Sequence, residues 1–113
     1  MNIIDISNVE FVDYSRDNLI VPGLKWCVIS YDKMTSKGSY ILKYDKGVRT
    51  PRHFHTGREE FLILEGVLED SNGEIFKKGT FVCYSPGTSH YTYSKNGCKA
   101  LVFSGGKNIV SKL

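Results

Sequence analysis

Several features that mark whole classes of protein are missing from this sequence. Its 15 lysine and arginine residues nearly balance 12 aspartate and glutamate residues, and no basic run concentrates the net charge of +3. A nucleic-acid partner is therefore not expected, because such binders usually gather positive charge into a stripe. The most apolar stretches, 18–24 and 61–68, are broken by proline, glycine or charge. They fall far short of the roughly 18 residues that a membrane span needs, so no membrane partner is expected either.

Export signals and a disulfide framework are missing as well. The first residues, 1–5, lack the basic stretch, the long apolar core and the small-residue cleavage site of a secretory signal. Cys27, Cys83 and Cys98 are odd in number and widely spaced, and no CxxC pair occurs. We therefore expect a cytoplasmic protein whose three cysteines are small buried apolar residues in a reducing compartment, rather than ligands or nucleophiles.

Helix-length apolar segments are also absent. A chain of 113 residues has the length of one domain, 1–113, and its apolar segments are shorter than an average helix of about 11 residues. Segments rich in Val, Ile, Thr, Tyr and Phe are expected as strands at 24–31, 39–44, 61–68, 80–84, 90–94 and 99–103. Turns containing glycine or asparagine separate them, with a hairpin expected at Asn72-Gly73. The pattern indicates an all-β sandwich or barrel, with residues 1–23 as edge strands or as an arm around the barrel or a partner subunit.

Histidine is scarce, and the placement of its three residues points to chemistry. His53 and His55 are two apart on an expected strand, so both imidazoles project from the same face. Glu59 follows a turn at 56–58 closely enough to lie beside them, and His90 comes from a separate unit that begins with a Pro-Gly turn. This nitrogen and oxygen donor set suits Zn, Fe(II), Mn, Ni or Cu. Four protein ligands leave a position open for catalysis or for sensing a ligand.

Each of these residues has a structural explanation when taken alone. The His53 and His55 pair could equally lie on a solvent face or bind the backbone, and His90 could be a structural histidine. Glu59 or Glu60 alone would most often be a solvated charge at the start of a strand. The metal interpretation depends on their convergence, because every histidine falls in one of two turn-strand units and a carboxylate lies within reach.

Two stretches, 47–66 and 79–94, resemble the paired signatures of the cupin superfamily. Their spacings are Gly47-x5-His53-x-His55-x3-Glu59-x6-Gly66 and Gly79-x5-Ser85-x-Gly87-x2-His90. The resemblance implies a jelly-roll barrel, or double-stranded β-helix, with a metal inside one mouth. It also implies that His53, His55, Glu59 and His90 are the metal ligands.

Within this superfamily, residues 38–103, and more loosely 22 onward, resemble the cupin domain of ChrR-type anti-sigma factors and their free-standing relatives. The stretches that carry this likeness are 53–60, 64–70, 86–90 and 96–98. Ser85 stands where the second signature usually has proline, and Ser94 where it often has asparagine; neither is a ligand. ChrR-type regulators hold their sigma factor with a separate zinc-binding helical domain, for which this chain has no room. Regulation of a sigma factor by this chain alone is therefore not implied.

Two functions are compatible with these residues. The resemblance implies either a metal-dependent dioxygenase acting on a small dicarbonyl or phenolic compound, or a non-enzymatic metal-binding sensor or regulatory module. Zn or Fe is the metal expected first, and Mn, Ni or Cu also fit. A small-molecule ligand is expected in both cases. No residue outside the ligand set is an obvious general acid or base, since Glu60 faces away from the site by strand parity.

The remaining expectations concern the surroundings of the site. Tyr40, Thr92 and Ser94 are candidate wall residues, while Tyr91 and Tyr93 face outward by parity. Arg49, Arg52 and Arg58 lie close in sequence and could line the pocket rim, although the more common explanation for each is a surface charge. Leu62 and Leu64 form an outward apolar set that needs cover. We expect a homodimer through this face, with residues 1–23 folding over it as the alternative.

Overall fold

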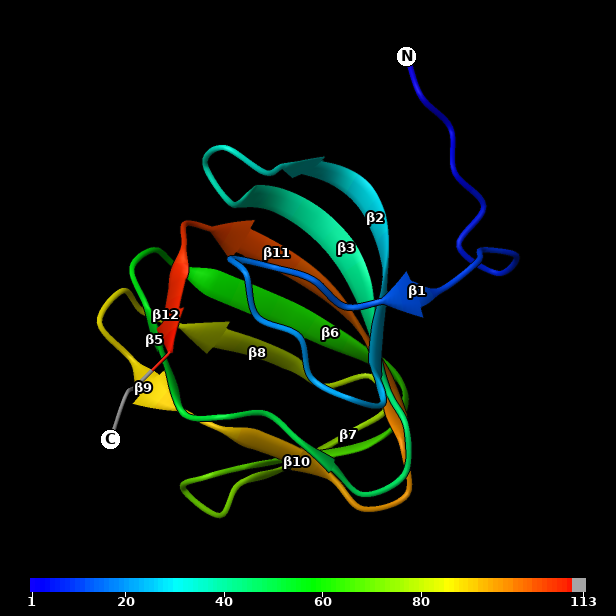
Figure 1. Cartoon of the computed structure of the whole chain (residues 1–113). Helices are drawn as coiled ribbons and strands as arrows, with labels where there is room; N and C mark the ends of the chain where they lie inside the picture. Colours follow the sequence, from blue (N-terminus) through cyan, green and yellow to red (C-terminus); the bar gives the residue numbers. More distant parts are fainter. Residues whose placement is uncertain (111–113) are drawn as a thin grey trace.

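Two antiparallel sheets curl around a common interior and leave it open at one end (Figure 1). The structure, a computed structural model, describes residues 1–110. The strands are β1 (Val12–Asp13), β2 (Leu24–Asp32), β3 (Lys37–Tyr44), β4 (Val48–Arg49), β5 (His53–His55), β6 (Glu59–Asp70), β7 (Ile75–Lys77), β8 (Phe81–Tyr84), β9 (Ser89–His90), β10 (Thr92–Ser94), β11 (Cys98–Gly105) and β12 (Asn108–Val110). The larger sheet has the order β1-β2-β3-β11-β6-β10-β4, and β7 and β8 also pair with β6. The smaller sheet has the order β12-β5-β9.

All six expected strand segments are present, and the all-β jelly-roll expectation is confirmed. The expected strand 90–94 is divided into β9 and β10 at Tyr91. The hairpin at Asn72-Gly73 joins β6 to β7, with Gly73 at a φ of 92°. The turn at 56–58 does not form a hairpin, because β5 pairs with β9 and β12 rather than with β6. It carries the chain from the smaller sheet to the larger one, and this crossing is what brings Glu59 to the histidines.

The long strand β6 depends on one glycine. Its first half pairs with β8 and β11, and its second half pairs with β7 and β10. At the change of partners, Gly66 has a φ of 76°, and a Cβ there would lie 2.2 Å from the carbonyl oxygen of Gly97. Only glycine fits a positive φ with a backbone so close. This position was part of the first cupin-like signature.

Aromatic rings fill the interior next to the opening. The Trp26 ring lies edge-on against Tyr14 and Tyr40, with centroid separations of 5.1 and 5.3 Å. Such edge-to-face pairs stabilise a core beyond the area they bury. Leu24, Ile63 and other buried residues continue the same core. The inward positions alternate along β6 as expected, with Phe61 and Ile63 buried and Leu62 and Leu64 on the other face.

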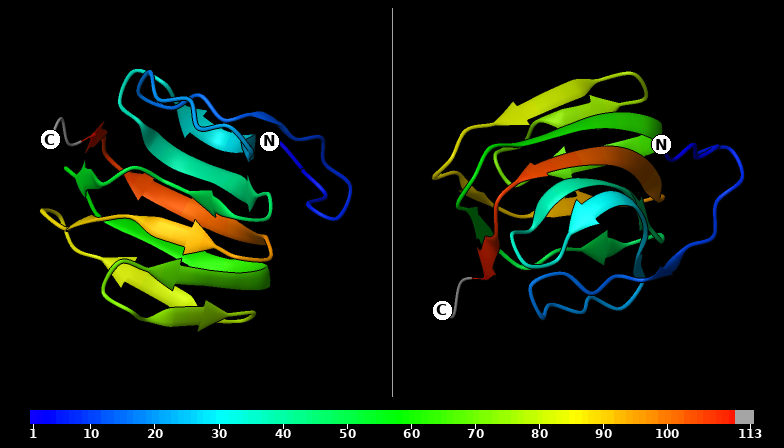
Figure 2. Two further views of the ribbon diagram at one scale, coloured as in Figure 1. Left: turned by 60° about the horizontal axis from the view of Figure 1, so that its bottom comes forward. Right: turned by 90° about the horizontal axis from the view of Figure 1, so that it is seen from above.

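The N-terminal segment closes the open end of the barrel. After β1 pairs with β2, the chain crosses the opening, turns at Asp17 and Asn18 and returns to β2 (Figure 1). We call residues 14–19 the strap. Residues 1–8 are exposed and extend away from the barrel (Figure 2). Residues 1–23, expected as edge strands or as an arm, thus contribute the edge strand β1 and the strap, and the strap covers the opening rather than the outer face at Leu62 and Leu64.

The cysteines do not all lie in the interior. Cys98 is buried and Cys27 is half-buried, as expected for small apolar residues, but Cys83 is exposed. Within the described chain, its strand β8 pairs with β6 on one side, so Cys83 lies at a sheet edge and its side chain faces outward. Within residues 1–110, the structure contains no helix that could cross a membrane.

Candidate metal centre

Four residues predicted from the sequence meet inside the barrel. His53 and His55 lie on β5, His90 lies opposite His53 on the paired strand β9, and Glu59 begins β6. All four side chains are buried, and each offers a potential ligand atom within 4.8 Å of the others. The alternation that puts Phe54 outside and both imidazoles inside is the one expected from the sequence.

Every imidazole of the cluster is oriented through its Nδ1 atom. Each Nδ1 lies at hydrogen-bond distance from an oxygen atom: His53 from Pro51 O at 2.9 Å, His55 from Asn108 Oδ1 at 2.8 Å, and His90 from Asp70 Oδ1 at 2.6 Å. Carbonyl and carboxylate oxygens only accept, so Nδ1 carries the proton in each ring. The Nε2 atom of each ring is therefore left with a free lone pair.

These free lone pairs fit a cation. Nε2 of His55 and Nε2 of His90 are only 2.7 Å apart. With both protons on Nδ1, two acceptors face each other without a donor between them, which is unfavourable unless a cation is shared. Burial lowers the pKa of His53 to about 4 and also lowers the pKa of His55, so both rings are neutral at neutral pH. Neutral imidazole is the form that binds a divalent transition metal.

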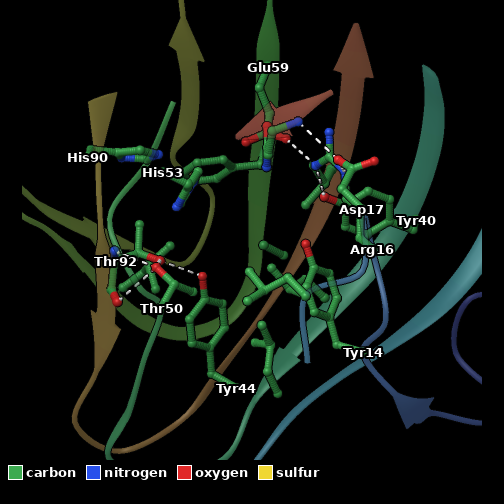
Figure 3. A pocket seen from close by; sticks show the side chains of 18 of the residues that line it. Tyr14, Arg16, Asp17, Tyr40, Tyr44, Thr50, His53, Glu59, His90 and Thr92 are labelled. Atoms are coloured by element: carbon green, nitrogen blue, oxygen red, sulfur yellow. Dashed lines mark hydrogen bonds and ion pairs between the residues drawn. The ribbon is translucent and has the colours of Figure 1, made fainter. Parts of the chain in front are cut away.

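The carboxylate of Glu59 is held on both sides. Its Oε1 accepts a hydrogen bond from Nη1 of Arg16 at 2.7 Å (Figure 3). Its Oε2 lies 3.2 Å from Nδ1 of His55. Arg16 is 2% exposed, and burial acts against its charge. The surrounding Tyr40 and Glu59 nevertheless hold the pKa of Arg16 above its ordinary value. The carboxylate is thus fixed in place by a permanent positive charge.

Arg16 also ties the strap to the barrel. It donates to Tyr40 Oη at 2.8 Å, to Ser104 Oγ at 2.6 Å and to Gly106 O at 2.6 Å. Sequence reasoning missed this residue. It lies in the least interpretable segment, and its side-chain partners stand 24, 43 and 88 residues away, so no local spacing marks it.

Asp70, another residue without a predicted role, supports His90. Its Oδ1 accepts hydrogen bonds from His90 Nδ1 and from Tyr84 Oη, each at 2.6 Å. Burial would raise the pKa of Asp70, but these two hydrogen bonds hold it below the ordinary value. The Tyr84 ring in turn stacks on His55, with centroids 5.6 Å apart. A carboxylate behind a metal-type histidine fixes both the tautomer and the ring orientation.

The cluster faces a small cavity of about 50 Å³. His53, Glu59 and His90 lie at one end, and the strap covers one side (Figure 3). The far wall carries a hydrogen-bonded group in which Thr92 Oγ1 lies 2.6 Å from Tyr44 Oη and 3.1 Å from Thr50 Oγ1. Apolar side chains complete the lining: Leu19, Leu24, Leu42, Phe61, Leu68, Ala100, Val102 and Val110.

The expectations about the wall are confirmed only in part. Tyr40 and Thr92 line the cavity, whereas Ser94 is fully buried behind it and donates to the backbone of β6. In the part of the chain that the structure describes, the arginine of the lining is Arg16. Of the two alternatives for the three other arginines, the structure agrees with surface charges, since surface rings or an exposed carboxylate hold them outside the cavity. Arg49 lies over Tyr91 and Tyr93, Arg52 over Tyr91, and Arg58 beside Glu60.

A curled antiparallel jelly roll with a buried cluster of three histidines and one glutamate facing its interior defines a cupin. Within the cupins, the family model of the ChrR cupin-like domain matches residues 1–108. The chain belongs to this family. A comparison with curated proteins gives no match.

Solved structures share the fold at low sequence identity. An acetylacetone dioxygenase from Acinetobacter johnsonii superposes with a TM-score of 0.80 at 19% identity, over 99% of this chain and 79% of that one. The polyketide cyclase RemF from Streptomyces resistomycificus gives 0.77 at 16% identity, over 100% and 87%. The complex of Rhodobacter sphaeroides SigE with the anti-sigma ChrR gives 0.68 at 18% identity, over 88% of this chain and 50% of the other. The present chain thus spans about half the length of that neighbour.

Proposed function

We propose that the chain is a metal-dependent dioxygenase acting on a small dicarbonyl compound, with one divalent transition metal held by His53, His55, Glu59 and His90. The observation that carries this proposal is the pair of facing, unprotonated Nε2 atoms of His55 and His90, next to a cavity that His90 lines. When bound, the metal supplies Lewis-acid and redox chemistry at that end. Zn and Fe suit the donor set first, and Mn, Ni or Cu are also compatible.

The chain's own residues contribute positioning and exclusion of water. The strap and the apolar lining enclose the reacting space, and Arg16 and Asp70 hold Glu59 and His90 in place. A buried water needs roughly 10–15 Å³ of cavity volume, so a cavity of about 50 Å³ suits a molecule the size of a few waters. Small dicarbonyl compounds match this size and the mostly apolar lining. The acetylacetone dioxygenase neighbour supports the same substrate class.

A non-enzymatic sensor is the second candidate. Every charged residue that lines the cavity is already paired, since Arg16 contacts both Glu59 and Asp17. Among the lining residues within 1–110, no charged acid or base is therefore left unpaired, which agrees with a module that only binds a ligand. The likeness to the anti-sigma ChrR supports this alternative. In that case the metal would hold the barrel together or bind the sensed molecule.

Metal analysis of protein purified without a histidine tag separates the two functions. The dioxygenase proposal expects a redox-active metal near one ion per chain, and oxygen consumption when pentane-2,4-dione or a catechol is added. Tightly held Zn, with no oxygen uptake after reconstitution with Fe(II), would instead favour the sensor. The double variant His53→Ala, His55→Ala is the control, and full metal content in that variant would show that the ligand set is wrong.

We further propose that a second copy of the chain covers the outer face of the larger sheet. Leu62 and Leu101 pair in register on this face, and Phe103 and Phe81 are 42% and 51% exposed on it. The exposed N-terminal residues begin at the same face, because the Phe11 ring lies 5.5 Å from the Nζ atoms of Lys43 and of Lys99. They carry three exposed isoleucines at positions 3, 4 and 6. The apolar N-terminal residues and the apolar outer face together favour a homodimer.

A further inference from the structure

The hydroxyl of Tyr14 differs from the other phenols around the cavity. Tyr14 begins the strap, is 6% exposed and points its oxygen into the cavity (Figure 3). Tyr40 Oη is bonded to Arg16, and Tyr44 Oη is bonded to Thr92. Across residues 1–110, Tyr14 Oη has no hydrogen-bond partner. Its oxygen borders the cavity rather than being sealed inside the fold, so it can donate a hydrogen bond to a molecule that enters the cavity.

The surroundings of Tyr14 keep it rigid and protonated. Its ring packs edge-on against Trp26, and its backbone N–H donates to Leu24 O at 3.0 Å. Burial raises the pKa of Tyr14, and this effect outweighs the opposing one of the nearby Arg16 charge. The phenol is therefore a fixed donor aimed at the space in front of His53 and His90.

The charge of the lining restricts what Tyr14 can bind. Arg16 is the cation of the described lining, and Glu59 and Asp17 already occupy its guanidinium group. A carboxylate or phosphate ligand would find no free positive side chain there. A neutral phenol instead suits an uncharged acceptor such as a carbonyl oxygen.

We infer that Tyr14 is a ligand-binding residue, whose hydroxyl donates a hydrogen bond to a carbonyl oxygen of the small molecule held in front of the histidines. This inference rests on the proposed metal cavity and adds the residue that selects the ligand. It also assigns the strap a role in specificity, since the same segment carries Tyr14 and the Arg16 anchor.

The first test concerns stability without any ligand. Tyr14→Phe keeps the ring on Trp26 and removes a hydroxyl that has no partner, so its melting temperature should equal or exceed that of the wild type. Tyr44→Phe is the matched control, because it removes a hydroxyl bonded to Thr92 and should melt at a lower temperature. A clearly lower melting temperature for Tyr14→Phe would show that its hydroxyl is already used by the fold, which would overturn the inference.

The second test measures binding by calorimetry to the anaerobic protein, loaded with the metal that analysis identifies. The probes are pentane-2,4-dione, which offers carbonyl oxygens, and azide, which has none. Tyr14→Phe should weaken pentane-2,4-dione binding about five- to tenfold, the range of one neutral hydrogen bond, and leave azide binding and metal content unchanged. Tyr93→Phe, whose ring lies under Arg49 outside the cavity, is the binding control and should leave pentane-2,4-dione affinity unchanged.

The outcomes distinguish this inference from the proposed function. Equal pentane-2,4-dione affinity in the wild type and Tyr14→Phe overturns the role of Tyr14 and leaves the metal site in place. A wild type that holds metal and binds azide but not pentane-2,4-dione overturns the carbonyl ligand class. A chain that binds no metal contradicts the proposed function. The same titrations on metal-free protein then decide on Tyr14, and the absence of any difference between wild type and variant there counts against it.

Discussion

Nη1 of Arg16 and Oε1 of Glu59 lie 2.7 Å apart in a buried ion pair that joins the strap to the first residue of β6. The two side chains are 1% and 10% exposed. This ion pair connects the strap directly to the metal centre, because Glu59 is one of the predicted metal ligands. Whatever loosens the strap must also release the carboxylate beside the histidines.

Replacing Arg16 is therefore expected to affect both stability and metal binding. Arg16→Met leaves Glu59 as a buried charge without its partner, which typically costs about 3–5 kcal/mol of unfolding free energy. Urea denaturation of the metal-free protein measures this loss, and the additional variant Glu59→Gln should recover part of it. Arg58→Met removes the exposed pair with Glu60 and should leave the urea midpoint unchanged. An equal loss of stability in both arginine variants would mean that the buried pair contributes no more to folding than the exposed one.

Asp70→Asn tests whether the orientation of His90 matters for metal binding. The amide keeps the shape of the carboxylate but removes the charge that accepts from His90 Nδ1 and Tyr84 Oη. Loss of such a supporting carboxylate typically lowers metal affinity about 10- to 100-fold. Competition with a chromophoric chelator measures this change. Asp45→Asn, at the more exposed pair with Lys25, is the control, and equal metal affinity in the two variants would contradict the role of Asp70.

The sequence predicted the parts of the site that depend on short-range geometry. Strand alternation placed His53 and His55 together, and the short turn kept Glu59 within their reach. The Pro-Gly turn before His90 and the cupin-like spacing predicted His90 as the remaining metal ligand. The relationships among His53, His55 and Glu59 span few residues, so local strand and turn geometry is enough to predict them. His90 meets His55 across 35 residues, and its place came from the resemblance.

Relationships across the barrel could not be predicted in the same way. Arg16 reaches Ser104 over 88 residues, and Asn108 reaches His55 over 53, so only the completed topology brings them together. The pairing of β5 with β9 and β12 instead of β6 has the same origin. The exposure of Cys83 depends on β8 being an edge strand, which composition does not reveal.

Gly47 and Gly66 have similar φ angles but different surroundings. Alanine substitutions at the two positions therefore distinguish backbone strain from steric collision. Gly47 has a φ of 79° with no atom within 4 Å of a built Cβ, so Gly47→Ala should cost only about 1–2 kcal/mol for the left-handed backbone. Gly66 has a φ of 76°, but its Cβ would collide with the backbone at Gly97. Gly66→Ala should lose roughly a further 1–3 kcal/mol from this overpacking, measured by urea denaturation. Equal losses at both positions would show that β6 adjusts at no cost.

The proposed homodimer predicts a mass of twice 12.8 kDa in light scattering after size exclusion. Phe103→Lys places a charge on the outer face of the larger sheet and should shift the protein to the monomer mass at micromolar concentration. Ile109→Lys is the matched control, because Ile109 is 56% exposed on β12, outside that sheet, and should leave the mass unchanged. A wild type that elutes as a monomer at these concentrations removes the dimer proposal, and the arm would then need another partner.

Metal removal should lower the free energy of unfolding by the amount that the bound metal contributes. Metal present at 100 times its dissociation constant stabilises the native protein by about 2.7 kcal/mol, so thermal unfolding should move to lower temperature when a chelator is added. His53→Ala, His55→Ala should lose this metal-dependent shift, because two of the buried donors are gone. Phe54→Ala is the internal control: its ring lies between the two histidines in sequence but is 41% exposed on the other face of β5. It should keep the full shift, and a variant without either histidine that still responds to metal would place the ion elsewhere in the chain.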